Sequence, residues 1–252
     1  MMRLLWTFLF LLVPLLGTAV FLVAPYFDHW LPESISVEAD EVDELFYIIL
    51  WLTGGVFIIT QLALVAFMWL YDGNSPKPKA AKYTHGNTAV EVTWTLVPGF
   101  ILLFLALYSQ NIHEALAINQ PPEPDLVVEV TGYQFNWKMR YPGPDGLFDT
   151  PDDIHNVSDL HIPVDQQVLI YLKSEDVLHS FFLPNLRLKQ DVVPGSKIPV
   201  WFTTNKIGTY DLVCAELCGW GHYKMKGRLT VESADDFQNW LKQKAAEQEA
   251  TQ

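Results

Sequence analysis

Residues 214–225 read Cys214-Ala-Glu-Leu-Cys218-Gly-Trp-Gly-His222-Tyr-Lys-Met225, and this segment is the most informative part of the 252-residue chain. It gathers two thiols, one imidazole and one thioether. Thiolate, imidazole and thioether are soft ligands, and as a set they favour copper over magnesium, calcium or manganese. A second imidazole, His179, lies upstream at the end of a strand-like run. These residues therefore predict a copper site.

Two other interpretations of the cysteines remain open at this point. A Cys-x3-Cys pair in an exported domain could form a disulfide, because oxidising compartments permit one. Two Cys and two His could instead hold a single zinc ion. The additional methionine and the presence of only two cysteines in the chain favour copper. A single-copper blue site needs only one cysteine, so the second thiol favours a binuclear site.

The motif resembles subunit II of cytochrome c oxidase. The resemblance rests on Cys-Ala-Glu-Leu-Cys-Gly-x-x-His-x-x-Met, on Ser-Glu-Asp-Val-Leu-His-Ser at 174–180 and on Asp-Val-Val-Pro-Gly at 191–195, and it runs from about Asp43 to Trp240. It implies a binuclear copper A centre with two bridging thiolates, one imidazole on each copper, a weak thioether ligand and a backbone carbonyl ligand. The residues in these roles would be Cys214 and Cys218, His179 and His222, Met225, and Glu216.

The ligand types suit electron transfer. Bridging thiolates allow two coppers to share one electron, so that each bond length changes little between oxidation states. A long thioether bond tunes the potential, as in mononuclear blue copper sites. Gly219 and Gly221 are expected to let the segment turn back between its ligands, because they carry no side chain.

Composition indicates a membrane-anchored protein with an external domain. Leu45–Tyr71 is free of charged residues, and Trp94–Ile112 has a similar character. Each run is long enough to cross a bilayer core, which takes about 20 helical residues. Residues 1–24 are either a cleaved secretory signal or a further transmembrane helix, and the length of their apolar run favours a retained helix.

Loop charges predict the orientation of this transmembrane hairpin, residues 45–112. The loop 72–90 carries Lys77, Lys79 and Lys82, whereas the segment 25–44 has seven acidic residues and neither Lys nor Arg. Positive charge marks the cytoplasmic side. The loop is therefore expected inside, with the acidic segment and everything after about residue 113 on the periplasmic side of a bacterial-type plasma membrane.

The external part reads as a β domain. Strand-like runs separated by turn signals occur at 126–130, 167–172, 198–202 and 228–231. Such spacing predicts a Greek-key sandwich or barrel, and the resemblance implies a cupredoxin fold over 113–233. A final helix at about Ala234–Glu249, within the tail 234–252, is expected to dock Phe237, Trp240 and Leu241 on the domain.

The resemblance also implies a function. The chain would accept electrons from an external cytochrome c and pass them to haem in subunit I, where O₂ is reduced to water with proton pumping. From residue 113 onward the net charge is −8, a sign that steers basic partners and argues against nucleic acid. The implied partners are subunit I and other oxidase subunits, membrane lipid, and cytochrome c or a supercomplex-bound cytochrome.

The chain departs from the family pattern at the electron-input segment. The family has Gly-His-Gln-Trp-Tyr-Trp, whereas this chain has Gly132-Tyr-Gln-Phe-Asn-Trp137. Phe135 therefore stands at the input position and Trp137 is retained. A nearby loop contains Asp145, Asp149, Asp152 and Asp153; it fits no EF-hand register, so we interpret 145–153 as an acidic surface loop, with a metal or donor contact left open.

Two carboxylates acquire roles by resemblance. The side chain of Glu216 would bind Mg²⁺ jointly with subunit I. Glu91 matches the acid at the mouth of a proton pathway, or else is a capping charge at a helix start. The remaining histidines fit no ligand spacing and are expected in surface or loop positions: His29, His85, His113, His155 and His161.

The sequence distinguishes this chain from several other protein classes. A quinol oxidase subunit II lacks the copper ligands, and nitrous oxide reductase needs a propeller domain for which this chain has no room. No Cys-x-x-Cys-His is present, so no haem c is attached. A copper chaperone holding one Cu(I) is the alternative from another functional class, a binding protein. The sequence leaves open the donor's identity and the haem types of the partner subunit.

Overall fold

The computed structural model describes residues 2–27, 29–71, 83, 85–113 and 123–250. They divide into two compact units, Met1–Leu31 with Glu44–Gln110, and Pro32–Asp43 with Asn111–Gln252. Most of the loop 72–90 falls outside the described residues, including its three lysines. The predicted positive charge of that loop therefore rests on the sequence alone.

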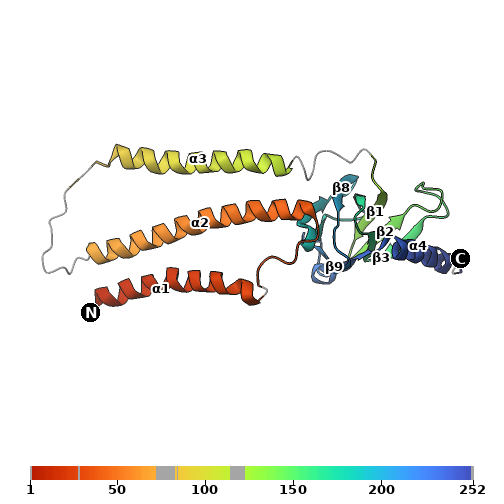
Figure 1. The fold of residues 1–252 in the computed structure, drawn as a ribbon, viewed down its shortest axis with the longest axis horizontal. Coiled ribbons are helices and arrows are strands. Elements are labelled where there is room, and N and C mark those ends of the chain that lie inside the picture. The colour runs from red at the N-terminus through yellow and green to blue at the C-terminus, as the bar shows by residue number, and fades with distance from the viewer. Residues whose placement is uncertain (1, 28, 72–82, 84, 114–122, 251–252) are drawn as a thin grey trace. The chain divides into compact units, whose positions relative to one another are not determined.

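Long helices make up the first unit (Figure 1). They are α1 (Met2–Val23), followed by a 3-10 turn at Ala24–Phe27, then α2 (Val37–Leu70) and α3 (Thr88–His113). Three stretches are long and apolar enough to span a membrane, Leu4–Phe27, Glu38–Leu70 and Thr88–Gln110. The two predicted spans lie almost entirely within α2 and α3, and the first 24 residues supply the third helix.

Both helices begin before the predicted apolar runs, and polar residues form their first turns. The first turn of α2 carries Glu38 and Asp40, whose charge is favourable at a helix N-terminus. In α3, the Asn87 side chain accepts hydrogen bonds from the backbone N–H groups of Ala89 and Val90, which makes it the N-cap.

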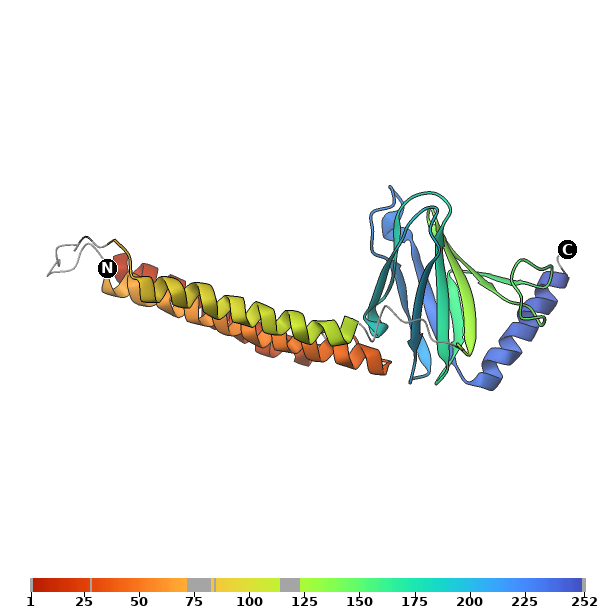
Figure 2. The same cartoon turned by 90° about the horizontal axis from the view of Figure 1, so that it is seen from above.

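The second unit contains two five-stranded sheets (Figures 1 and 2), in the orders β3-β2-β1-β5-β8 and β4-β10-β9-β6-β7. Pairings are antiparallel except β1 with β5 and β10 with β4. The predicted sandwich is confirmed. Its strands are β1 (Leu126–Tyr133), β2 (Asn136–Tyr141), β3 (Ile154–Val157), β4 (Asp159–Pro163), β5 (Gln167–Ser174), β6 (His179–Leu183), β7 (Leu188–Val192), β8 (Ile198–Thr203), β9 (Gly208–Cys214) and β10 (Lys226–Glu232).

Alternating residues of these strands fill the core of the β domain, as period-2 patterning requires. Trp137 and Met139 of β2 are fully buried and pack with residues of both sheets. Val130 of β1 pairs with Met139, so the two strands bring their inward side chains to the same level. The candidate ligands Cys214, Cys218 and Met225 belong to this same buried cluster, so the candidate site lies against the core.

A segment far upstream in the sequence completes the β domain. Ile35 and Ala39 are fully buried, and the backbone N–H of Ile35 donates to the carbonyl of Asn185. The Arg187 guanidinium donates two hydrogen bonds to the Asp43 carboxylate, at 2.7 and 2.8 Å. Bidentate pairs of this kind are among the stronger protein ion pairs. The acidic segment 25–44 therefore contributes residues 32–43 to the β unit, although we predicted it as a separate external stretch.

Helix α4 (Ala234–Glu249) has the predicted bounds and contacts β3 and β4. The Ser233 hydroxyl caps it by accepting from the N–H of Asp236. Phe237 enters the core, and Trp240 and Leu241 pack against it, as expected.

The expectation that His161 lies at the surface is wrong. It is 9% exposed, its Nδ1 lies 2.7 Å from Glu232, and its ring stacks on Trp240 at 4.1 Å. A partner carboxylate more than 70 positions away makes this burial favourable, because buried polar groups require partners.

Candidate metal centre

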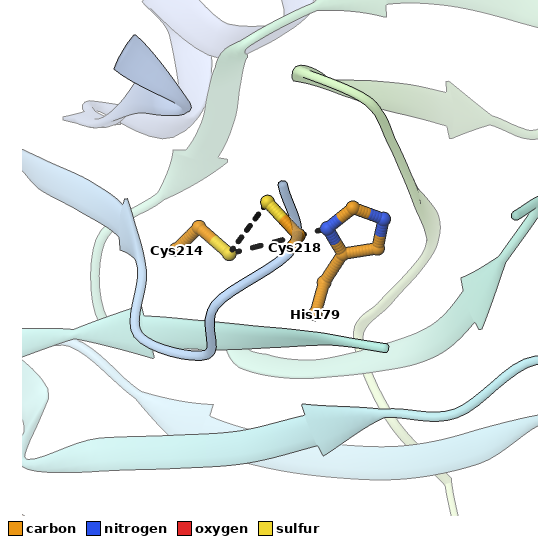
Figure 3. Close-up of side chains that lie close together, drawn as sticks. All are labelled: His179, Cys214 and Cys218. Carbon is orange, nitrogen blue, oxygen red and sulfur yellow. Dashed lines mark hydrogen bonds between the residues drawn. The ribbon is translucent and has the colours of Figure 1, made fainter. Parts of the chain in front are cut away.

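The predicted ligands come from two neighbouring strands and the loop that follows one of them (Figure 3). His179 opens β6 and Cys214 closes β9, and these strands pair through Phe181 and Cys214. The remaining ligands lie between β9 and β10, in the segment 214–225, which we call the ligand loop. Residues 35 positions apart therefore meet at one end of a sheet.

The two cysteine sulfurs lie 3.9 Å apart, and both thiols are free and buried. A disulfide bond is about 2.05 Å long, so the two sulfurs are separate. If metal–sulfur bonds are about 2.3 Å, as in zinc thiolates, two sulfurs at this separation can both bind the same metal. The spacing therefore fits bridging thiolates.

Each sulfur has an imidazole of its own. The Nδ1 atom of His179 lies 4.0 Å from the Cys214 sulfur, and the Nδ1 atom of His222 lies 3.7 Å from the Cys218 sulfur. These separations are slightly less than the sum of one metal–sulfur and one metal–nitrogen bond, roughly 4.3 Å. A metal bonded to the sulfur and the nitrogen of either pair would therefore have a wide sulfur–metal–nitrogen angle. Each cysteine sulfur thus has one histidine nitrogen beside it.

Two weaker donors complete the set. The Met225 sulfur lies 3.7 Å from the Cys218 sulfur, and the Glu216 carbonyl accepts from the Cys214 thiol at 3.2 Å. Met225 is fully buried, so its thioether faces the cluster and not solvent. The structure thus brings together all six predicted ligand residues. His179, Cys214 and Cys218 form the tightest group, with ligand atoms within 4.8 Å of one another.

Burial and, to a lesser extent, the neighbouring Cys214 together raise the pKa of the Cys218 thiol to about 11. A thiol binds a metal as the thiolate, so a binding metal must displace this proton. Soft cations that bond strongly to sulfur are able to do so. The chemistry of the donor set therefore fits copper.

Asp176 orients His179 and was missed from the sequence. Its Oδ1 lies 2.8 Å from the Nε2 of His179, which turns the other ring nitrogen toward the sulfurs. Burial raises the pKa of Asp176, but hydrogen bonds from His179 and from the backbone of Gln134 and Val177 outweigh burial and lower it. The Asp-x-x-His spacing is the only sequence signal for this role.

The ligand loop is held by backbone contacts. The Gln134 amide donates to the Cys218 carbonyl at 2.6 Å, and the N–H of Cys214 donates to the Met225 carbonyl at 3.1 Å. Gly219 has φ +133°, a conformation that favours glycine, and a Cβ at Gly221 would lie 2.5 Å from the Phe135 ring. The two glycines therefore have the turning role that the sequence predicted.

Phe135 and Trp137 have different surroundings. Phe135 is partly buried against the ligand loop, and its ring lies edge-on to Trp220, with centroids 5.3 Å apart. Trp137 is fully buried between Phe181 and His179. Of the two residues assigned to electron input, only Phe135 approaches the surface, and the contact with Trp220 was not foreseen.

The other carboxylates are engaged in protein contacts. Glu91 accepts a hydrogen bond from the N–H of Asn87 at 3.2 Å, as a capping residue does. In the acidic loop, Arg140 pairs with Asp149 and with the buried Asp153, whose carboxylate also accepts from the N–H of Asp149. The half-buried Glu216 contributes its carbonyl to the ligand cluster.

Comparisons with known proteins cover both units. The family model described as cytochrome C oxidase subunit II, periplasmic domain, matches residues 126–233, and the corresponding transmembrane-domain model matches residues 25–112. Cytochrome c oxidase subunit 2 of Thermostichus vulcanus is 32% identical, over 91% of this chain and 84% of its own length. Alternative cytochrome c oxidase subunit 2 of Bradyrhizobium diazoefficiens is 30% identical, over 93% and 90%.

A solved structure is also similar. The periplasmic domain of subunit II of cytochrome oxidase of Bradyrhizobium japonicum is 26% identical, with a TM-score of 0.46, and the match covers 51% of this chain and 99% of that domain.

Proposed function

The chain belongs to the cytochrome c oxidase subunit II family, and from that premise we propose that it is the electron-accepting subunit of a terminal respiratory oxidase. Family membership makes it a component of a haem-copper oxidase complex, anchored in a membrane with a periplasmic β domain. In our proposal the six ligand residues hold a binuclear copper A centre. Electrons arrive from an external cytochrome and continue to haem in subunit I, where O₂ reduction is coupled to proton pumping.

The observation that carries this proposal is the pairing of each cysteine sulfur with its own imidazole. Cys214 lies beside His179, Cys218 lies beside His222, and the sulfurs are 3.9 Å apart. One metal would use both sulfurs and still leave one imidazole at a distance. Two copper ions held by Cys214, Cys218, His179 and His222 would use every one of these donors, and such a centre would supply one-electron transfer with little change in geometry.

The chain's own residues keep that geometry fixed. Asp176 holds the His179 ring, while Gln134 holds the Cys218 carbonyl. Burial of both cysteines and of Met225 excludes water from the sulfurs. Preorganised ligands cost little reorganisation when charge changes, which is the same advantage that fixed dipoles give in catalysis.

Two further roles belong to the proposal. The Glu216 side chain would bind Mg²⁺ together with subunit I, since its carbonyl already faces the ligand cluster. Glu91 would receive protons at the start of a pathway in subunit I. Its carboxylate accepts a hydrogen bond from the Asn87 N–H, which supports a capping role as the alternative.

The decisive test is the visible and EPR spectrum of the full chain in detergent, loaded with copper and then oxidised. We expect a purple species with one electron shared over two copper nuclei. The zinc-loaded chain, colourless and EPR-silent, is the control. A single Cu(I) with no colour and no EPR signal would instead support the copper-chaperone alternative. Absence of bound copper, with Cys214 and Cys218 joined as a disulfide, would exclude both functions.

A further inference from the structure

The ligand loop exposes three large apolar side chains to solvent. Trp220 is 80% exposed, Leu217 75% and Tyr223 66%. Single exposed apolar residues are common, but a cluster on one short loop is a feature of interaction sites. Trp, moreover, is strongly enriched among residues that dominate binding energy. This loop therefore has a binding surface in addition to its metal ligands.

Trp220 occupies a particular place on that loop. One glycine separates it from Cys218 and one glycine separates it from His222. Its indole is therefore connected to two ligands by a short covalent path, without a jump through space. Electronic coupling decays more slowly along bonds than across gaps, so this side chain is well connected to the cluster.

Phe135 packs against the indole of Trp220. Its ring lies edge-on to Trp220, with a 68° interplanar angle, which is a favoured aromatic arrangement. The same ring fills the space over Gly219 and Gly221. Because Phe135 is itself partly buried, Trp220 is the more exposed ring of the pair. Phe135 thus packs against the Trp220 ring and holds it in position.

We propose that Trp220 is the residue through which the electron donor docks and delivers its electron, with Phe135 as a positioning residue. This inference rests on the proposed function. The donor is a reduced one-electron carrier protein whose redox group reaches its surface within an apolar rim. One electron leaves that carrier and reaches the metal centre held by Cys214 and Cys218. Trp220 is unchanged at the end, and no bond or proton is transferred.

The choice of occupant follows from the surface chemistry of the loop. Leu217, Trp220 and Tyr223 offer apolar contact. Lys224 Nζ lies 5.4 Å from the centre of the Tyr223 ring, and the Asp176 carboxylate is engaged with His179 and the Gln134 N–H. Weak redox encounters use small interfaces, whose central residues are apolar and aromatic. The net negative charge of the wider domain then steers the carrier, and Trp220 makes the close contact.

The test uses the assembled oxidase containing the full chain, with Trp220→Ala, Trp220→Leu and Trp220→Phe. We expect Trp220→Ala to lower the second-order rate of electron transfer from the carrier by at least about 30-fold, as for truncation of an interface hot spot. Trp220→Phe should recover part of this loss, whereas Trp220→Leu, which keeps apolar area without a ring, should not. Ile207→Ala is the matched control, because it removes an equally apolar side chain that is 60% exposed and lies just before β9, at the far end of that strand from Cys214, and it should change the rate less than threefold.

Two further readouts separate this inference from the proposed function. The copper spectrum should be the same in all variants, and O₂ consumption driven by a small diffusible reductant should be unchanged. If the wild type shows the copper spectrum but Trp220→Ala and Trp220→Leu keep the carrier rate, the inference is wrong and the proposed function stands. If the wild type lacks the spectrum, the proposed function itself fails. If Trp220→Ala loses copper, the carrier rates of Trp220→Phe and Trp220→Leu are compared instead. A faster rate for Trp220→Phe supports the inference, and equal rates contradict it.

Discussion

The ligand loop and the acidic loop (residues 145–153) contain potential metal ligands in similar numbers, yet their donor atoms have different surroundings. In the acidic loop, the carboxylates of Asp149 and Asp153 pair with Arg140, and the Asp145 carboxylate accepts from the N–H of Leu147. In the ligand loop, sulfur and nitrogen atoms face one another at 3.7–4.0 Å. A metal site is marked by donors that lack strong partners in the protein, and not by the number of ligand-type residues.

The largest effect is expected from removal of one bridging thiol. Cys218→Ser should abolish the shared-electron EPR signal of the copper-loaded full chain, because a hydroxyl is a much weaker ligand for copper than a thiolate. Met225→Leu is the matched control, since it removes only a long, weak contact. That variant should keep both coppers and change the reduction potential. Two shared-electron coppers in Cys218→Ser would contradict the ligand assignment.

Loss of the residue that orients His179 should have a smaller effect. Asp176→Ala removes the partner of the imidazole Nε2, and loss of such partners typically weakens metal binding about 10- to 100-fold. Copper affinity is measured by competition with a chelator. Asp152→Ala, which removes a carboxylate from the acidic loop, is the control and should leave the affinity unchanged. Equal affinities in wild type and Asp176→Ala would show that the ring is held by other contacts.

In the acidic loop the prediction concerns stability. Asp153→Ala removes one of the two buried carboxylates that pair with Arg140, the other being Glu129, and should lower the free energy of unfolding by about 1–3 kcal/mol. Its copper spectrum should equal that of the wild type, and millimolar Ca²⁺ should not raise the melting temperature of either protein. A calcium-dependent rise in melting temperature that disappears in Asp153→Ala would overturn the distinction between the two loops.

The smallest effect is a dependence on pH at Glu129, which pairs with Arg140, Lys173 and Lys197. Burial raises the pKa of Glu129, but these three cations outweigh burial and lower it to about 2. A lowered folded-state pKa gives stability that is complete above the ordinary value of 4.5 and is lost as pH falls towards 2. Thermal unfolding should therefore show that the difference between wild type and Glu129→Gln shrinks over this pH range. If the difference in stability between wild type and Glu129→Gln stayed constant over this pH range, the stabilising role of the Glu129 ion pairs would be refuted.

The sequence was sufficient for features that depend on near neighbours. The close grouping of Cys214, Cys218, His222 and Met225 could be predicted because they lie on one loop. Helix α4 could be predicted because its apolar residues follow the helical period. Partnerships between distant residues could not be predicted. The burial of His161 depends on Glu232, and the position of Asp43 depends on Arg187, 144 residues away. Neither pair leaves a local pattern in the sequence.

The electron-input segment lies between these cases. Phe135 was identified as a departure from the family pattern, but its contact with Trp220 joins residues on two separate loops. Trp220 itself looked like an ordinary residue between two glycines, and only its exposure and its neighbour give it significance. The contact between the two rings is visible only in the structure, because the spacing of the motif does not predict it.

The packing of residues 32–43 on the β domain has a consequence for biosynthesis. Ile35 is translated long before Asn185 and Arg187, so its binding site does not exist until most of the domain has left the ribosome. We therefore expect residues 32–43 to dock on the β domain only after residues 185–187 have been synthesised. The same connection sets a rule for protein engineering. A soluble fragment that begins after α3 would expose the surface that Ile35 and Ala39 cover, so we expect residues 32–43, joined to it by a linker, to stabilise it.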